Sequence, residues 1–162
     1  MERTRTFSWE DPSIGAKQAL HMSGLEYIQA MKDEKIPPPP VMHTLNFRLT
    51  SIEPGKAVFS FVPSEFHYNP IGTVHGGVIT TVLDSALGCA VHSLLPLGKA
   101  YTTLELKVNF IKAITKSNGE LTATARVIHA GSKTALVEAQ ITDSTGKIYA
   151  HSVSTCMIFS IE

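Results

Sequence analysis

Residues 78–94 read VITTVLDSALGCAVHSL, and this stretch decides the fold. Its apolar residues repeat at i, i+1, i+4 and i+5, which is the pattern of one broad stripe along an α-helix. A stripe of this width predicts a mostly buried helix. Pro96 and Gly98 follow and are expected to end it.

The sequence after this helix alternates with a period of two, which is typical of β-strands. In residues 101–111, one face is expected to carry Leu104, Leu106, Val108 and Phe110, and the other Thr103, Glu105, Lys107 and Asn109. Three further strands are expected at 121–128, 135–142 and 147–161, separated by turns at 117–119, 130–132 and 143–146. Strands spaced this closely predict an antiparallel meander.

The sequence before the helix predicts a helical segment and a hairpin. Residues 13–35 favour a helix with Ser13 as a candidate N-cap and a break near Ser23-Gly24. The prolines at 37–40 end that helix, and we expect a rigid connector there rather than a ligand for an SH3 domain. Strands near 45–50 and 56–63 flank a turn at 52–55. Six alternating strands and one apolar helix indicate an α+β architecture.

Composition excludes several classes of protein. The chain has 162 residues, 43% of them hydrophobic, and 14 basic residues balance 14 acidic ones. This balance argues against a protein that coats nucleic acid or anionic lipid. No apolar run approaches the length of a membrane span and no signal peptide is visible, so we expect a soluble cytoplasmic protein. Cys89 and Cys156 are expected to be buried reduced thiols, and no metal site is expected.

The residues with chemical potential stand directly before and within the apolar helix. Residues 69–77 read NPIGTVHGG, and the free N–H of Gly76 or Gly77 at a helix start can stabilise a developing oxyanion. Asp84 is a costly charge in so apolar a helix unless it is exposed, paired or functional. As a functional group it would be a general base or a nucleophile. We expect His75 to position the loop, and Asn69 to hold either the loop or a substrate carbonyl.

The run Asn69-x2-Gly72-x2-His75-Gly76-Gly77-x6-Asp84 resembles the hotdog-fold thioesterases of the PaaI type. Residues 108–112, 131–134 and 146–147 fit the same pattern, so the resemblance spans about residues 40–160. It implies a curved antiparallel sheet of about six strands wrapped around one long buried helix, with an extra N-terminal helix. Residues 1–40 would then be an N-terminal arm, helix and proline-rich connector, and residues 41–162 the hotdog thioesterase domain.

The resemblance also implies an activity, the hydrolysis of aromatic or medium-chain acyl-CoA. Asp84 would be the catalytic carboxylate and the Gly76 N–H would polarise the thioester carbonyl, with Asn69 and His75 shaping the site. A water-holding Ser or Thr of the family falls on Thr103, or on Thr102 if the register slips by one. Three further residues would lie near the CoA nucleotide, or would simply be solvated turn residues: Lys112, Ser132 and Lys133.

Partners and alternatives follow from the same resemblance. Two subunits would share a continuous sheet with active sites at their interface, and would assemble further into a homotetramer. No metal or redox cofactor is implied, since coenzyme A is part of the substrate, and neither nucleic acid nor membrane is an expected partner. The extra N-terminal helix is expected to cap part of the acyl pocket. Two alternatives stay open, an enoyl-CoA hydratase or dehydratase of the same fold and a non-catalytic acyl-CoA-binding protein.

Overall fold

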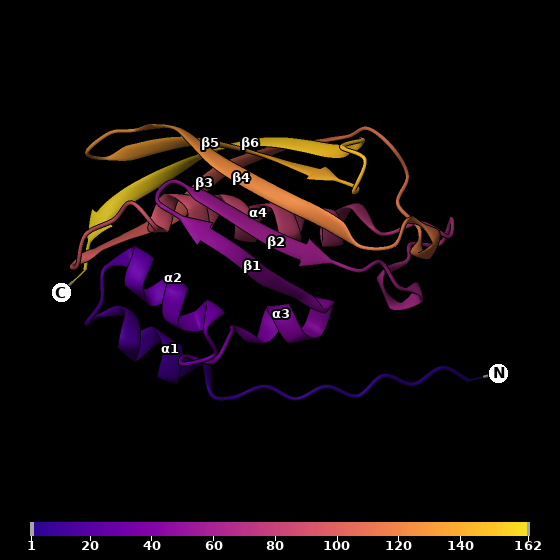
Figure 1. The fold of residues 1–162 in the computed structure, drawn as a ribbon, viewed down its shortest axis with the longest axis horizontal. Coiled ribbons are helices and arrows are strands. Elements are labelled where there is room, and N and C mark those ends of the chain that lie inside the picture. The colour runs from indigo at the N-terminus through magenta and orange to yellow at the C-terminus, as the bar shows by residue number, and fades with distance from the viewer. Residues whose placement is uncertain (1, 162) are drawn as a thin grey trace.

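One long helix, α4 (Gly76–His92), lies against the concave face of a curved antiparallel sheet in the computed structural model, which describes residues 2–161 (Figure 1). The sheet has six strands in the order β1-β2-β4-β5-β6-β3. Their bounds are β1 Phe47–Glu53, β2 Lys56–Phe61, β3 Lys99–Phe110, β4 Leu121–Ala130, β5 Thr134–Thr142 and β6 Ile148–Ser160. This topology confirms the expected α+β hotdog architecture.

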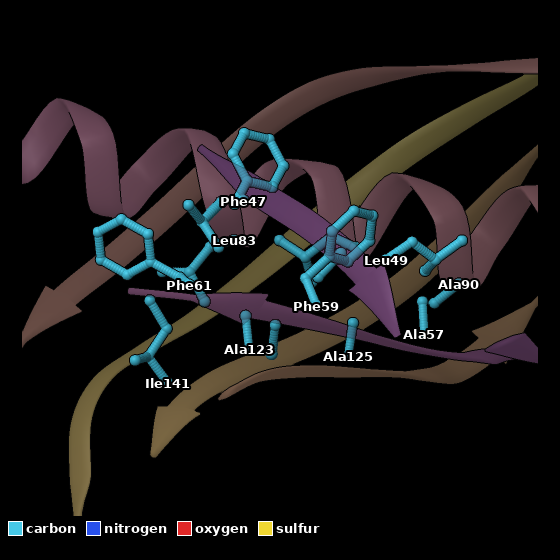
Figure 2. Packing of buried hydrophobic residues seen from close by; sticks show 14 of the residues in the cluster. Phe47, Leu49, Ala57, Phe59, Phe61, Leu83, Ala90, Ala123, Ala125 and Ile141 are labelled. Carbon is cyan, nitrogen blue, oxygen red and sulfur yellow. The ribbon is translucent and has the colours of Figure 1, made fainter. Parts of the chain in front are cut away.

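The apolar stripe of α4 forms the centre of the core, as predicted. Val82, Leu83 and Leu87 of this helix are fully buried. The sheet presents small side chains beneath them, among them Ala57 and Ala125, so the helix can approach the strands closely. Figure 2 shows phenylalanine rings from β1 and β2 together with these alanines around α4. Because this face of α4 is so fully buried, the helix is held rigidly, and the side chains on its other face keep fixed positions.

Two short helices precede the sheet, and the break between them falls where it was expected. They are α1 (Pro12–Ala19) and α2 (Gly24–Lys32), and α2 begins with a capping box formed by Ser23 and Glu26. The expectation that Ser13 caps the first helix is wrong. Asp11 is the N-cap and accepts a 2.9 Å hydrogen bond from the Ser13 N–H. Pro12 takes the first helical position, where its missing donor costs nothing.

The proline run ends in a helix that the sequence did not predict. Pro40 opens α3 (Pro40–Leu45), which stops at Asn46 in a left-handed conformation with φ of 52°. The first strand therefore begins at Phe47, and Leu45 belongs to a helix rather than to the alternating run. Two 3₁₀ turns, η1 (Glu65–His67) and η2 (Lys116–Asn118), complete the elements.

A β-bulge in β3 changes which residues face the helix. Thr103 pairs with Cys156 and Glu105 with Thr155, so Leu104 is the extra residue, and it is 56% exposed. The expectation that Leu104 shares a face with Leu106 is therefore wrong. A bulge inserts one residue and reverses the alternation. As a result, Thr103 points inward on the same side as Leu106 and Val108.

β3 is an edge strand of the sheet, and no strand pairs with its outer side among residues 2–161. None of its twelve residues is fully buried, unlike every other long strand in the sheet. An exposed edge of this length is a template for pairing with another chain. None of the helices in the described part of the chain combines the length and hydropathy that crossing a bilayer requires.

Candidate active site

The loop from Asn69 to His75 leads into α4 and is held by the Asn69 side chain. Asn69 Oδ1 accepts hydrogen bonds of 3.1 Å from the N–H groups of Ile71 and Thr73, and Asn69 Nδ2 donates to Thr73 Oγ1 at 2.9 Å. The backbone N–H of Asn69 donates to the Thr73 carbonyl at 2.8 Å. Of the two roles considered for Asn69, the structure supports holding the loop.

His75 is the N-cap of α4. Its Nδ1 accepts a 2.9 Å hydrogen bond from the Gly77 N–H, so the ring proton of neutral His75 resides on Nε2. The Gly77 donor is thereby used, whereas the Gly76 N–H has no hydrogen-bond partner among residues 2–161. The two glycines therefore differ in role. The Gly77 N–H caps the helix with His75, and the Gly76 N–H is the donor available to a bound oxyanion.

A cavity of about 270 Å³ lies beside this free donor. Phe110 closes one side of it, because a Cβ added to Gly76 would come within 3.1 Å of that ring. A larger residue at this position would therefore require the Phe110 ring to shift by a few tenths of an ångström. The wall of the cavity includes Asn69, Thr73, Gly76, Phe110, Lys112 and Ile114.

Asp84 lies two turns further along α4 and is half-buried. Its Oδ1 accepts a hydrogen bond of 3.0 Å from Thr103 Oγ1 across the gap between the helix and β3. Thr102, the alternative position, is exposed. The structure therefore brings the Asp84 and Thr103 side chains together.

Cys89, one turn beyond Asp84, has no nucleophilic character. Burial, together with the nearby Asp84 charge, raises the pKa of the Cys89 thiol to about 12. A thiol with such a pKa holds its proton at neutral pH. Both cysteines are free, as the sequence predicted. Among residues 2–161, no three His, Cys, Asp or Glu side chains gather in a way that could hold a metal ion.

Asp84 and Gly76 of one chain do not face a common point. Eight residues of helix separate them, which corresponds to about 12 Å along the helix axis. One thioester carbonyl cannot contact both. If the two groups act on the same carbonyl, they must come from different protomers.

The three residues expected near the CoA nucleotide lie at two ends of the sheet, and all are exposed. Lys112 follows β3 at the Gly76 end, where Phe110 pairs with Ala150. Ser132 and Lys133 form the turn between β4 and β5, and the Lys133 carbonyl accepts from the Ile158 N–H at 2.8 Å. Eight residues of strand between 150 and 158 span about 26 Å. A single chain therefore does not bring these three residues together.

Sequence reasoning missed His67, which is buried behind the loop. Its Nδ1 accepts from the Ser64 N–H at 3.0 Å, and its Nε2 lies 2.9 Å from the Leu45 carbonyl. Its own carbonyl accepts from the His75 N–H at 2.8 Å. Burial lowers the pKa of His67, which favours the neutral ring. A lone histidine in a polar stretch carries no signal by which the sequence could have revealed this role.

Comparisons with known proteins match the segment that contains these groups. A profile of the thioesterase superfamily matches residues 71–150. A 1,4-dihydroxy-2-naphthoyl-CoA hydrolase from Listeria monocytogenes is 31% identical over 118 residues, which cover 73% of this chain and 93% of that protein. The crystal structure of a phenylacetic acid degradation-related protein from Ralstonia eutropha has a TM-score of 0.72 and 27% identity, covering 80% of this chain and 97% of that one. A Streptococcus mutans protein crystallised with acetyl CoA has a TM-score of 0.65 and 26% identity, covering 71% and 90%.

Proposed function

Because this chain belongs to the thioesterase superfamily, as a hotdog-fold protein of the PaaI-like type, we propose that it hydrolyses the thioester of an aromatic or medium-chain acyl-CoA. The observation that carries the proposal is the hydrogen bond between Thr103 and Asp84 on the exposed side of α4. It fixes one carboxylate oxygen and leaves the other for water or substrate. The coenzyme A portion of the proposed substrate is supported by the relatives, one named as a CoA ester hydrolase and one crystallised with acetyl CoA.

In the proposed reaction, Asp84 takes one of two roles. It either deprotonates a water molecule that attacks the thioester carbon, or it attacks that carbon itself. The carbonyl oxygen gains negative charge as the new C–O bond forms, and the Gly76 N–H stabilises it. The C–S bond then breaks and coenzyme A leaves as a thiolate. In the general-base route, Asp84 passes to this thiolate the proton that it took from water. In the direct-attack route, water then hydrolyses the anhydride between the acyl group and Asp84, which frees the carboxylate, releases the acid and supplies the proton for the thiolate. A thiolate is a good leaving group, so the chain needs to supply only the base, the donor and the positioning.

The tautomer of His75 favours hydrolysis over the hydratase alternative. A hydratase would use this histidine to move a proton at carbon. Here Nδ1 is occupied by the Gly77 N–H, and Nε2 carries the proton. In this tautomer Nε2 is a hydrogen-bond donor rather than a base.

We further propose that two chains pair through their β3 edges and that each active site combines groups from both. Antiparallel pairing about the middle of β3 would set the Gly76 end of one chain beside the Asp84 of its partner. It would also bring Lys112 toward the turn of the other chain that carries Ser132 and Lys133, where the CoA phosphates would bind. A homotetramer of two such dimers is the expected final assembly, and sedimentation equilibrium would give its mass.

The test of the proposed function is thiol release from acetyl-, hexanoyl-, benzoyl- and phenylacetyl-CoA. The Asp84→Asn variant should lower kcat by about 10²-fold or more, since it removes the carboxylate with little change in shape. Asp33→Asn, which alters an exposed carboxylate at the end of α2, is the matched control and should keep full activity. If the folded wild type releases thiol from none of these esters, the hydrolase proposal fails. Binding without turnover would then indicate an acyl-CoA-binding protein. Hydration of an enoyl-CoA would instead indicate a hydratase.

A further inference from the structure

The bulge in β3 places Thr103 against Asp84, although the hydrophobic pattern of the strand favours a different arrangement. A regular strand would carry Leu104 on the buried face together with Leu106 and Val108, because all three are apolar and alternate with polar residues. In the structure Leu104 is instead 56% exposed, and Thr103 takes the inward place. Contacts other than the burial of apolar side chains must therefore stabilise the bulge.

Ser154 of β6 stabilises the bulge from the concave face of the sheet. Its hydroxyl donates a 2.7 Å hydrogen bond to the carbonyl of Glu105, the residue that directly follows Leu104. Ser154 is fully buried, and it pairs with Leu106 of β3 and Val137 of β5 on the face that packs against α4. A hydroxyl in such apolar surroundings is costly unless it has an acceptor. Ser154 thus favours the register that sets the Glu105 carbonyl beside it.

Glu105 stabilises the same bulge from the convex face. Its Oε1 accepts a 2.9 Å hydrogen bond from the N–H of Thr155, the β6 residue with which Glu105 pairs. A bulge locally disrupts the ladder of backbone hydrogen bonds, and a carboxylate is a strong acceptor for a backbone N–H. The bulged part of β3 is therefore bonded to β6 on both faces of the sheet, by the Ser154 hydroxyl and by the Glu105 carboxylate.

Two nearby residues of the same types make different contacts. Ser152, two residues before Ser154, is also fully buried on β6, but its hydroxyl donates to the Ala139 carbonyl of β5 at 3.5 Å. Glu138 of β5 accepts a 2.9 Å hydrogen bond from the Arg126 side chain. These two residues contact strands on the side of β6 away from the bulge. They offer matched controls for Ser154 and Glu105.

We propose that Glu105 and Ser154 are positioning residues for the active site, and that they keep the Thr103 hydroxyl on Asp84 by fixing the bulge at Leu104. For its effect on turnover the inference rests on the proposed thioester hydrolysis, to which it adds two residues outside the site itself. Without both contacts, β3 should adopt the regular alternation that its sequence favours. Leu104 would then turn toward α4, and the Thr103 hydroxyl would leave Asp84.

The first experiment is structural and requires no activity. A crystal structure of the Glu105→Ala/Ser154→Ala double variant should show Leu104 turned toward α4 and Thr103 Oγ1 beyond hydrogen-bond distance of Asp84 Oδ1. Circular dichroism checks the fold, and the two single variants replace the double variant if it does not fold.

The control is the Glu138→Ala/Ser152→Ala double variant, which makes the same two kinds of substitution away from the bulge. Its structure should keep the 3.0 Å contact between Thr103 and Asp84. If that contact also persists in the variant lacking Glu105 and Ser154, the inference is overturned, whatever the activity.

The second experiment measures thiol release from acyl-CoA. Glu105→Ala and Ser154→Ala should each lower kcat about threefold, and the double variant about tenfold, with KM within about twofold of wild type. Glu105→Gln keeps an oxygen acceptor at the same place and should retain most of the activity. A double variant with wild-type kcat would overturn the inference.

A mutant cycle shows whether the two residues act through Thr103. If they do, adding Thr103→Val to the Glu105→Ala/Ser154→Ala double variant should lower kcat by less than about twofold more, because the hydroxyl has already left Asp84. A further loss of about tenfold would mean that Glu105 and Ser154 act independently of Thr103, which contradicts the inference.

The outcomes separate this inference from the proposed function. If the wild type releases thiol from none of the esters, the hydrolysis proposal fails, and the crystal structures still decide whether Glu105 and Ser154 fix the bulge. If the wild type is active and the double variant keeps both the Thr103 contact and full turnover, the inference alone fails.

Discussion

The Thr103 hydroxyl donates to the Asp84 carboxylate at 3.0 Å because a bulge at Leu104 turns Thr103 toward the helix. In a regular strand without the bulge, Thr103 would lie on the same side as Glu105, away from α4. Bulges are common beside active sites because they redirect a single side chain while the rest of the strand keeps its pairing. The bulge thus connects strand geometry to the position of the proposed catalytic carboxylate.

Replacing Thr103 should therefore affect the chemical step. Thr103→Val keeps the shape but removes the donor to Asp84, and kcat should fall about tenfold with little change in KM. Thr103→Ser keeps the hydroxyl and should retain most of the activity. Thr102→Val, at the exposed neighbour, is the control and should behave as wild type in steady-state kinetics. Equal losses in both valine variants would refute a specific role for Thr103.

The Gly76 N–H can be removed with little change to the helix. Proline is tolerated at the first helical position, and His75 already has ψ of 136°, which suits a residue before proline. Gly76→Pro should lower kcat about 10²- to 10³-fold, the effect of losing an oxyanion donor. Gly76→Ala keeps the N–H and introduces the same contact with Phe110, so it reports the steric part alone. The proposal requires that proline cause the larger loss.

Active sites shared between two chains predict recovery of activity on mixing. Asp84→Asn and Gly76→Pro chains, each inactive alone, should regain about a quarter of the wild-type activity after being refolded together in equal amounts. The reason is that one site in each mixed dimer then has both an intact loop and an intact carboxylate. Refolding each variant alone is the control. No recovery despite dimer formation would mean that both groups act within one chain.

Stability should fall as the pH is lowered below about 6.5, because His67 is buried and His92 is half-buried, and burial favours the neutral ring of each. Burial lowers the pKa of both, and the charge of Arg5 lowers that of His67 further. Below pH 6.5 the unfolded chain binds more protons at these positions than the folded one, so folding becomes less favourable. Each histidine contributes a slope of at most about 1.4 kcal/mol per pH unit.

Urea unfolding between pH 5 and 8 would measure this effect. His67→Gln should flatten the decline in the free energy of unfolding, and adding His92→Gln should flatten it further. His129→Gln, at an exposed position in β4, is the control and should leave the curve unchanged. A curve that stays as steep in the double variant would assign the acid sensitivity to other groups.

Periodicity sufficed to predict the parts of this fold that obey a regular pattern. The stripe in α4 and the alternation in β5 run without interruption, so their buried faces follow from the sequence. The bulge at Leu104 and the short helix α3 were not predictable in this way. One extra residue in a strand leaves no mark on composition, and the proline run fits a connector as well as a helix start.

The residues of the candidate site also differ in how far the sequence predicts them. Asp84 stands out as a charge in an apolar helix, and Gly76 as a glycine at its start. Alternation alone, however, places Thr103 on the face away from α4, and only the pairing of β3 with β6 reverses this. The use of His75 and Asn69 as a helix cap and a loop anchor depends on side-chain directions, which sequence spacing does not specify.

The hydrogen bonds of Asn69 bear on how tightly a substrate can be held. Its side chain and backbone tie residues 69–73 together through hydrogen bonds made within the chain itself. Ordering a flexible loop of this length on binding would cost several kcal/mol of conformational entropy. Here that entropy is lost during folding, so the contacts made with the substrate carbonyl count almost entirely toward affinity.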